Sequence, residues 1–472
     1  MANLEHSEEE LEDAEAEAGY GVTAELVQTV RGLLESGQTE SLRTVIAELH
    51  AADVADLLEQ LDGDDREKFI EATRQDIEAE TLTYLDEDVR DDVVEMLGAK
   101  EVAQAFTELE TDDAVDILED LDEEAKQEIL AAVPAAERAI LEEGLTYPED
   151  SAGRLMQRDL VAVPSYWTVG ETIDFLRASD HLPDDFYDLF IVDPRHKPIG
   201  KVPLSRAMRN KRSAKLTDIM ETELRPVRVD MDQEEVAYMF RQYALVSTPV
   251  VDDAERLVGV ITVDDVVHVI EEETEEDLMS LSGVGESDFH ASTLETAWRR
   301  LRWLFVTLIN TIIAATVISQ FDATIEQIVA LAVLMPIVAA MGGNAGMQVV
   351  TVTVRALATR DLSPGSNIVR AVGKEVMVNA LNAVIFAVVM GLLAALWFNS
   401  QKLGLVLAAA MVFNMAWAGL AGTIIPIVLH RLELDPAVSA GPFLTTTTDV
   451  LGFFSFLGLA TLFFVVEQFS SD

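Results

Sequence analysis

The pattern of polar and apolar positions along the 472 residues changes most sharply near residue 298. Beyond that point lie five long apolar stretches, at about residues 303–320, 327–354, 371–398, 403–430 and 438–466. Each is close to or above the roughly 20 residues that a helix needs to cross a bilayer. We therefore predict an α-helical transmembrane domain with five spans over residues 299–472.

The first part of the chain follows an acidic tail at residues 1–20 and has the period of amphipathic helices. Within residues 21–146 the segment ADVADLLEQLD at 52–62 returns as DDAVDILEDLD at 112–122. Helical hairpins that repeat in this way bury their apolar faces by stacking, because a single hairpin cannot bury its own. We predict an α-helical, solenoid-like N-terminal domain.

From Tyr147 the pattern becomes one of strands alternating with helices. A strand, a capped helix and a strand at residues 161–193 return, with a further strand and a closing helix, at residues 225–270. This tandem α/β pattern resembles a pair of cystathionine-β-synthase (CBS) domains, at residues 147–215 and 216–273. The resemblance makes ATP a candidate ligand of the pair but places no ATP-binding residue. Residues 274–298 are then expected to form a connecting (plug) helix.

The net charge of −51 belongs to the first 298 residues, because residues 299–472 hold nine acidic and nine basic residues. Such a surface disfavours nucleic acid and anionic lipid as its partners and suits divalent cations. At molar salt the Debye length is about 3 Å, so we interpret the source as halophilic and most acidic clusters as solvated surface. Cysteine is absent, which excludes disulfides and thiolate metal sites.

Inside the second apolar stretch, residues 335–348 read MPIVAAMGGNAGMQ. Proline removes a backbone donor and each glycine costs about 1 kcal/mol relative to alanine, so we predict a broken helix here. In a membrane such a break is tolerated where it is buried in protein or lines a water-filled path. Asp449, which follows four threonines, is the only acidic residue well inside any apolar stretch. An ionisable residue there indicates a functional site, and together the two features indicate a cation path.

The order of acidic helical domain, CBS pair, connecting helix and five spans resembles the MgtE family of magnesium channels and transporters over nearly the whole chain. The most specific matches are Met341–Gly346 with Gln348, Arg355–Asp361, Asp435–Ala437 and Thr445–Gly452. The resemblance implies that two subunits form one pore, in which Asp449 of each would hold a hydrated Mg²⁺. Asn344 and the backbone of Gly342 and Gly343 would line the same path, with Asp435 near its cytosolic mouth.

Members of that family also sense cytosolic Mg²⁺ through acidic residues between their soluble domains, and the bound ion closes the channel. The resemblance matches these sensor residues to Asp112, Asp116, Glu234, Asp265, Glu273, Glu276 and Asp277. His268 and Ala244 stand where relatives carry acids, which puts at least one sensor site in doubt.

Basic residues around the spans predict the orientation of the chain in the plasma membrane. They precede the first span or flank the loop after the second, at Arg299, Arg300, Arg302, Arg355, Arg360, Arg370 and Lys374, whereas the loop after the first span has none. We therefore expect the N-terminal domains in the cytosol and the C-terminus outside. The expected partners are a second copy of the chain, magnesium ions and the lipid bilayer, with no nucleic acid.

We interpret the chain as a magnesium channel or transporter that cytosolic Mg²⁺ closes, and not as an enzyme. Co²⁺ or Ni²⁺ is the alternative cargo, because a site for a hydrated ion discriminates weakly. A membrane-anchored CBS sensor without transport would need neither Asp449 nor a broken span. An intramembrane aspartyl protease needs two carboxylates sharing a proton, and we find one. A second interpretation of residues 335–348 and Asp449 is a structural one. The glycines would form a seam of small residues for helix packing, and Asp449 would be hydrogen-bonded to its neighbours.

Overall fold

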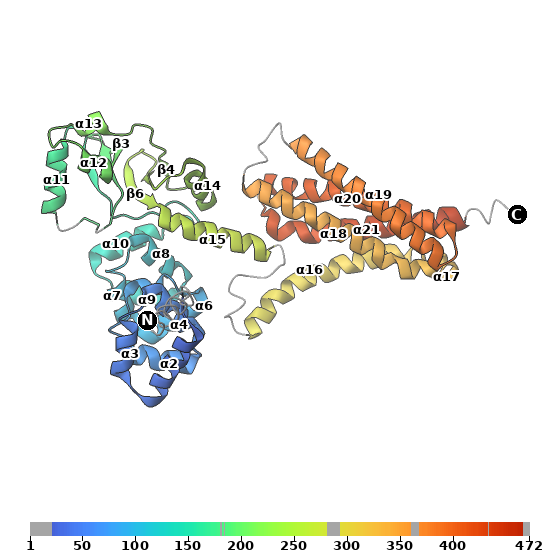
Figure 1. The fold of residues 1–472 in the computed structure, drawn as a ribbon, viewed down its shortest axis with the longest axis horizontal. Coiled ribbons are helices and arrows are strands. Elements are labelled where there is room, and N and C mark those ends of the chain that lie inside the picture. Colours follow the sequence, from blue (N-terminus) through green and yellow to red (C-terminus); the bar gives the residue numbers. More distant parts are fainter. Residues whose placement is uncertain are drawn as a thin grey trace, which may run out of the picture. The chain divides into compact units, whose positions relative to one another are not determined.

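The structure is a computed structural model that describes residues 21–179, 182–183, 185–280, 293–359, 368–432 and 434–465. Within these ranges the side chains at positions 277, 295, 299 and 465 are not described. The chain divides into two compact units, Met1–Glu271 and Glu272–Asp472. Figure 1 colours them from blue to red along the sequence. Each unit has apolar cores of its own.

The first unit begins with a helical domain whose helices share one apolar core. They are α2 (Ala24–Ser36), α3 (Thr39–Ile46), α4 (Ala51–Gln60), α5 (Gly63–Thr73), α6 (Glu87–Leu97), α7 (Ala99–Ala105), α8 (Thr111–Asp120), α9 (Glu123–Ala132) and α10 (Ala135–Gly144), with a 3₁₀ turn η1 (Ala79–Leu82) before α6. The prediction of an α-helical N-terminal domain is confirmed.

The internal repeat corresponds to two helical hairpins, α4–α5 and α8–α9. Leu61 and Leu121 end the first helix of each hairpin in extended conformation, and both side chains are buried. The aspartate that follows caps the next helix: Asp62 accepts a hydrogen bond from the amide of Asp65, and Asp122 accepts one from Ala125. A buried leucine followed by a capping aspartate thus turns the chain at the same place in each repeat.

Two three-stranded sheets follow, each with a first strand parallel and a last strand antiparallel to the middle one. The first holds β1 (Ala162–Pro164), β2 (Asp188–Val192) and β3 (Pro198–Pro203), with helices α11 (Val169–Ala178), α12 (Leu204–Arg209) and α13 (Leu216–Ile219). The second holds β4 (Val227–Arg228), β5 (Ser247–Val251) and β6 (Leu257–Thr262), with α14 (Gln233–Tyr243). Asp188 joins the two sheets, because it accepts hydrogen bonds at 2.7 Å from both Lys201 and Ser247. The tandem α/β prediction is confirmed.

The closing helix of the second repeat, α15 (Val263–Ser280), is longer than predicted. The sequence analysis ended this helix at residue 270, and that end is wrong, because α15 continues to Ser280. Glutamate is a good helix former, so the acidic run continues the helix. Of the predicted connecting helix at residues 274–298, residues 281–292 lie outside the described part of the chain.

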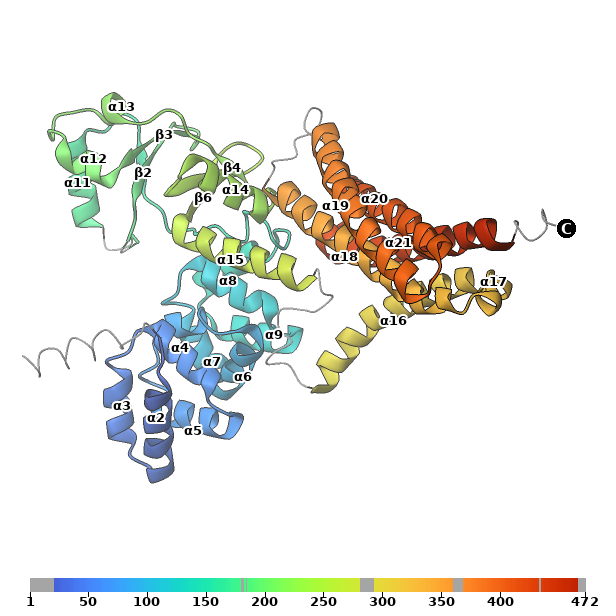
Figure 2. The same ribbon diagram turned by 45° about the vertical axis from the view of Figure 1, so that its right-hand side comes forward.

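The second unit contains five helices that are long and apolar enough to cross a membrane, which confirms the prediction of five spans. They are α16 (Thr293–Ser319), α18 (Ala330–Ala358), α19 (Ile368–Trp397), α20 (Gln401–Arg431) and α21 (Pro436–Ala460), with the short α17 (Asp322–Gln327) after the first and a π-helical turn η3 (Thr461–Val465) after the last. In both Figure 1 and Figure 2, α20 lies against α18, α19 and α21. The helix that carries Asp449 is therefore next to the helix that carries the glycine-rich motif.

The prediction of a broken helix at residues 335–348 is wrong, because α18 is helical from Ala330 to Ala358 with Pro336 inside it. In a bundle, neighbouring helices and side chains compensate for the lost donor. Gly342 and Gly346, four residues apart, instead let two neighbours approach: the side chain of Asn414 packs on the first and that of Leu444 on the second. For the glycines, the seam of small residues is the correct interpretation.

Candidate metal centres

Three carboxylates from two helices meet in the first unit. Glu110 immediately precedes α8, Asp112 lies in its first turn, and Asp265 lies in the first turn of α15. One oxygen of each lies within 4.8 Å of the others. Figure 2 shows the start of α15 beside α8, the arrangement that brings these residues together. Two of the three, Asp112 and Asp265, are among the predicted sensor residues.

The cluster contains an unused buried acceptor. Asp112 is 6% exposed, and its Oδ1 has no hydrogen-bond partner among the described residues. Asp265 uses one oxygen, Oδ2, to accept from the amide and hydroxyl of Thr262 at 3.2 and 2.7 Å. Glu110 accepts from the side chain of Gln157. Oxygen atoms that remain available, held by helix ends, suit a hard divalent cation such as Mg²⁺.

Burial, and after it the crowding of like charges, raises the pKa of these carboxyls. Burial, and then the charge of Asp265, raise the pKa of Glu110 and of the adjacent Asp113 to about 7. Burial and the same neighbours raise the pKa of Asp112 well above its ordinary value. Burial raises the pKa of Asp265, while its bonds to Thr262 oppose the shift. A divalent cation would offset the repulsion between the carboxylates, which is the smaller cause of these shifts.

Among the described residues, no other predicted sensor acid belongs to this cluster. Asp116 forms an ion pair with the buried Arg90 at 3.0 Å. Glu234 is exposed in the first turn of α14. Glu273 and Glu276 lie on the part of α15 that belongs to the second unit, and the side chain of Asp277 is outside the described residues. The structure therefore brings together two of the seven predicted sensor acids, and adds Glu110 to them.

At the two positions where relatives carry acids, this chain has His268 and Ala244, and neither side chain can replace a carboxylate. His268 is exposed, and its ring lies 6.3 Å from that of Tyr84 in an edge-to-face arrangement. Ala244 ends α14 in the left-handed conformation, with φ of 49°. A β-carbon at such a φ is strained, so this position serves the turn out of the helix.

In the membrane unit, Asp449 is half-buried on α21 and makes no hydrogen bond or ion pair within the described part of the chain. The preceding threonines do not satisfy it, because their hydroxyls donate to carbonyls of their own helix; Thr446 donates to Pro442 at 2.7 Å and Thr448 to Leu444 at 3.0 Å. The interpretation in which Asp449 is hydrogen-bonded to its neighbours is therefore wrong.

The other predicted pore residues lie on α18 and at the start of α21. Asn344 is exposed on α18, and Gly343 has open space where a side chain would stand. Gly342 is buried against α20, so it offers packing and not a free surface. Asp435 is exposed and caps α21 by accepting from the amides of Ala437 and Val438 at 2.7 and 3.4 Å.

Comparison with known proteins adds the decisive observation. A family model described as a divalent cation transporter, MgtE, matches residues 335–459, which include most of α18 and nearly all of α21. The MgtE intracellular N domain matches residues 49–150, and a CBS domain matches residues 216–272. The magnesium transporter MgtE of Thermus thermophilus is 33% identical over 444 residues, which are 93% of this chain and 98% of that one.

The chain belongs to the MgtE family. The magnesium transporter MgtE of Bacillus subtilis is also similar, with 31% identity over 71% of this chain and 74% of its own. Among solved structures, the cytosolic domain of the Mg²⁺ channel MgtE in complex with ATP is 31% identical and covers 52% of this chain and 100% of that one, with a TM-score of 0.49. Membership in a family of transporters confirms that the chain is not an enzyme.

Two residues of this MgtE protein were missed by reasoning from sequence. Glu110 is one of many acids on a very acidic surface, and no pattern distinguishes it from solvated neighbours. Asn414 had a signal, because it is an amide in the middle of an otherwise apolar span. Its side chain is fully buried between α20, α18 and α21.

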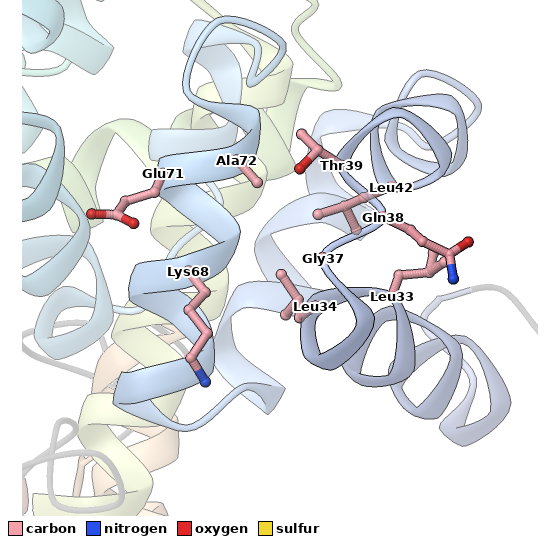
Figure 3. A pocket seen from close by; sticks show the side chains of 9 residues that line it. All are labelled: Leu33, Leu34, Gly37, Gln38, Thr39, Leu42, Lys68, Glu71 and Ala72. Carbon is pink, nitrogen blue, oxygen red and sulfur yellow. The ribbon is translucent and has the colours of Figure 1, made fainter.

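A separate hollow of about 290 Å³ lies in the helical domain and is drawn in Figure 3. It is bounded by the end of α2, the start of α3 and one face of α5, with Lys68 and Glu71 among its lining residues. Lys68 pairs with Asp65 at 2.8 Å. A single carboxylate beside a lysine does not make a site for a divalent cation.

Proposed function

We propose that this protein transports Mg²⁺ across the plasma membrane through a pore formed by two copies of the chain, with Asp449 at its axis. The observation that carries the proposal is a half-buried carboxylate on a spanning helix, next to the family's glycine-rich helix, with no hydrogen bond or ion pair among the described residues. An isolated charge in that setting is costly unless it serves an ion path. One carboxylate from each of two copies would balance one divalent ion.

The remaining pore residues extend this proposal. Asn344 and the backbone of Gly343 would line the path, and Asp435 would stand at its cytosolic mouth. Gly342, which was predicted to line it too, packs against α20 instead. Mg²⁺ gives up its waters reluctantly, so oxygens of these groups would reach it through its hydration shell. Such a site discriminates weakly by ligand chemistry alone, and Co²⁺ or Ni²⁺ remains the alternative cargo.

The test is the substitution Asp449→Asn, which keeps the shape of the side chain and removes its charge. We expect Mg²⁺ uptake into proteoliposomes to fall by at least about ten-fold, because a ring of carboxylates selects and concentrates cations. Glu375→Gln is the matched control, since Glu375 is an acid on the spanning helix α19 and outside the proposed pore. Wild-type uptake in Asp449→Asn at equal protein density would refute the pore.

We further infer that cytosolic Mg²⁺ binds at Glu110, Asp112 and Asp265 and favours the closed state. The support is the approach of three carboxylates to within 4.8 Å, and the buried Oδ1 of Asp112, which has no hydrogen-bond partner among the described residues. A bound ion shifts a conformational equilibrium only by its differential affinity for the two states. This site fits that requirement because its ligands come from two helices, α8 and α15, whose approach assembles it.

Several finer assignments stay predictions. They are the sensor roles of Asp116, Glu234, Glu273, Glu276 and Asp277, the binding of ATP to the CBS pair, and the cytosolic location of the N-terminal domains. The ATP in the solved cytosolic domain belongs to that protein.

A further inference from the structure

Asn414, in the middle of α20, takes no part in the proposed pore or sensor, yet its side chain is 0% exposed. Its Nδ2 donates a hydrogen bond of 2.9 Å to the backbone carbonyl of Val338 on α18. Its Oδ1 is buried and has no hydrogen-bond partner among the described residues. One side chain of α20 is thus bonded to the backbone of a different spanning helix.

Two glycines on two helices make room for this amide. A β-carbon on Gly342 of α18 would collide with Nδ2 of Asn414. A β-carbon on Gly452 of α21 would stand 2.7 Å from the same atom. Because real β-carbons do not approach so closely, Asn414 fits only while both positions are glycine. The amide therefore contacts the helix of Asn344 and the helix of Asp449 at once.

The contacts also fix the register of α18 and α21. Further along α18, a β-carbon on Gly346 would stand 2.8 Å from the side chain of Leu444 on α21. Residue numbers rise along α18 and fall along α21 between the two contacts, so these helices run antiparallel. Asn344 and Asp449 lie between the contacts. At 1.5 Å per residue they are about 3 and 4.5 Å from the level of Asn414, on the same side.

If Asn414 only filled space between the helices, its buried Oδ1, which has no partner among the described residues, would be unfavourable. A buried polar atom without a partner lowers stability. Thr423, also buried on α20, avoids that penalty by donating to the carbonyl of Gly419 on its own helix at 2.9 Å. A residue of that kind at position 414 would fill similar space, but it would remove the amide that touches α18 and α21 together at this level.

We propose that Asn414 is a positioning residue that, by touching α18 and α21 together, sets the separation of Asn344 and Asp449 and with it the ion preference of the pore. This inference rests on the proposed function, in which those two side chains line the path. Asn414 does not touch the ion. It acts through the two helices that it joins.

The test is Asn414→Thr in the full-length protein, with Asn414→Ala as a second variant if the first folds poorly. We expect the melting temperature in detergent to stay unchanged or rise, while Mg²⁺ uptake falls several-fold and the ratio of Mg²⁺ to Co²⁺ uptake changes by at least about three-fold, since small displacements of positioned groups have large effects. Thr423→Val is the matched control, and we expect it to keep the wild-type ratio.

Each other outcome has a defined meaning. A wild-type ratio in Asn414→Thr, or a loss of uptake that only follows a loss of folded protein, overturns the inference. If Asp449→Asn keeps wild-type uptake, the pore assignment fails whatever Asn414 does. If Asp449→Asn abolishes uptake and Asn414→Thr changes no ratio, only the positioning role fails.

A second variant pair tests the contact itself. Gly452→Ala places a methyl group against Asn414, whereas Gly458→Ala on the same helix has no atom within 4 Å of the new carbon. We expect Gly452→Ala to lower uptake and Gly458→Ala to leave it unchanged. In the Asn414→Ala background, Gly452→Ala should cause no further loss, because the colliding group is gone. Additive losses would overturn the proposed contact.

Discussion

At the scale of residues, the crowded carboxyls of the sensor cluster make a pH-dependent prediction. Burial and neighbouring charge raise the pKa of Glu110 from 4.5 to about 7. A carboxyl whose pKa is raised by folding stabilises the fold below its unfolded-state pKa, and this contribution is lost as the pH rises through the folded value. The metal-free protein should therefore lose stability between pH 4.5 and about 7. Above that range Glu110 is charged, and Mg²⁺ should restore the stability.

The measurement is the melting temperature of the full-length protein with and without Mg²⁺, at about pH 6 and about pH 8 and constant KCl. We expect the rise caused by Mg²⁺ to be larger at the higher pH, because protons no longer compete with the ion. Asp112→Asn should abolish the difference between the two pH values. Asp53→Asn is the control, since Asp53 lies in the first turn of α4, the helix that corresponds to α8 in the repeat. An unchanged response in Asp112→Asn would contradict the assignment.

Functional residues could be predicted from the sequence where their chemistry is rare among the surrounding residues. They could not be predicted where the same chemistry is common. Asp449 is conspicuous because it is an acid among apolar residues, and it has no hydrogen bond or ion pair in the part of the chain that the structure describes. Glu110 is one of 84 acids, and only the approach of α15 to α8 distinguishes it. Proximity across 155 positions is a property of the fold, which no local pattern in one sequence carries.

At the scale of elements, Asp435 at the start of α21 has two roles that substitutions can distinguish. Its carboxylate caps the helix, and its charge is proposed to attract cations at the pore mouth. Asparagine caps helices about as well as aspartate, whereas alanine costs about 1 kcal/mol. We therefore expect Asp435→Asn to keep the wild-type melting temperature and lose a few-fold in Mg²⁺ uptake, and Asp435→Ala to lose both. Wild-type uptake in Asp435→Asn would leave capping as the only role.

Elements that depend on a local pattern were predicted correctly, whereas an element that depends on contacts between distant residues was not. The five spans and the α4–α8 repeat depend on periodic apolar positions, which the sequence displays directly. The integrity of α18 depends on what packs against its glycines, namely Asn414 and Leu444, some 70 to 100 positions away. Glycine in a membrane helix therefore has two meanings, a break or a close contact, and only the neighbouring helix decides between them.

At the scale of the whole molecule, the distribution of basic residues predicts the side on which each loop lies. The chain has no cysteine, so single cysteines can be placed without removing others. Gln401→Cys at the start of α20 should react with a membrane-impermeant maleimide on intact cells, and Ala358→Cys at the end of α18 should react only after permeabilisation. Both positions are exposed in the described structure. The reverse labelling would place the sensor cluster outside the cell.

The meeting of Asn414 with Gly342 and Gly452 has an evolutionary consequence. There is no room at this point for another methyl group while the amide is present. A lineage can therefore gain a side chain at position 342 or 452 only after position 414 has become smaller. Once the amide is lost, either glycine position can gain a methyl group, and asparagine can then return only after both positions are glycine again. Descendants of this architecture that keep the amide should accordingly keep both glycines, and side chains at positions 342 and 452 should occur only where the amide is absent.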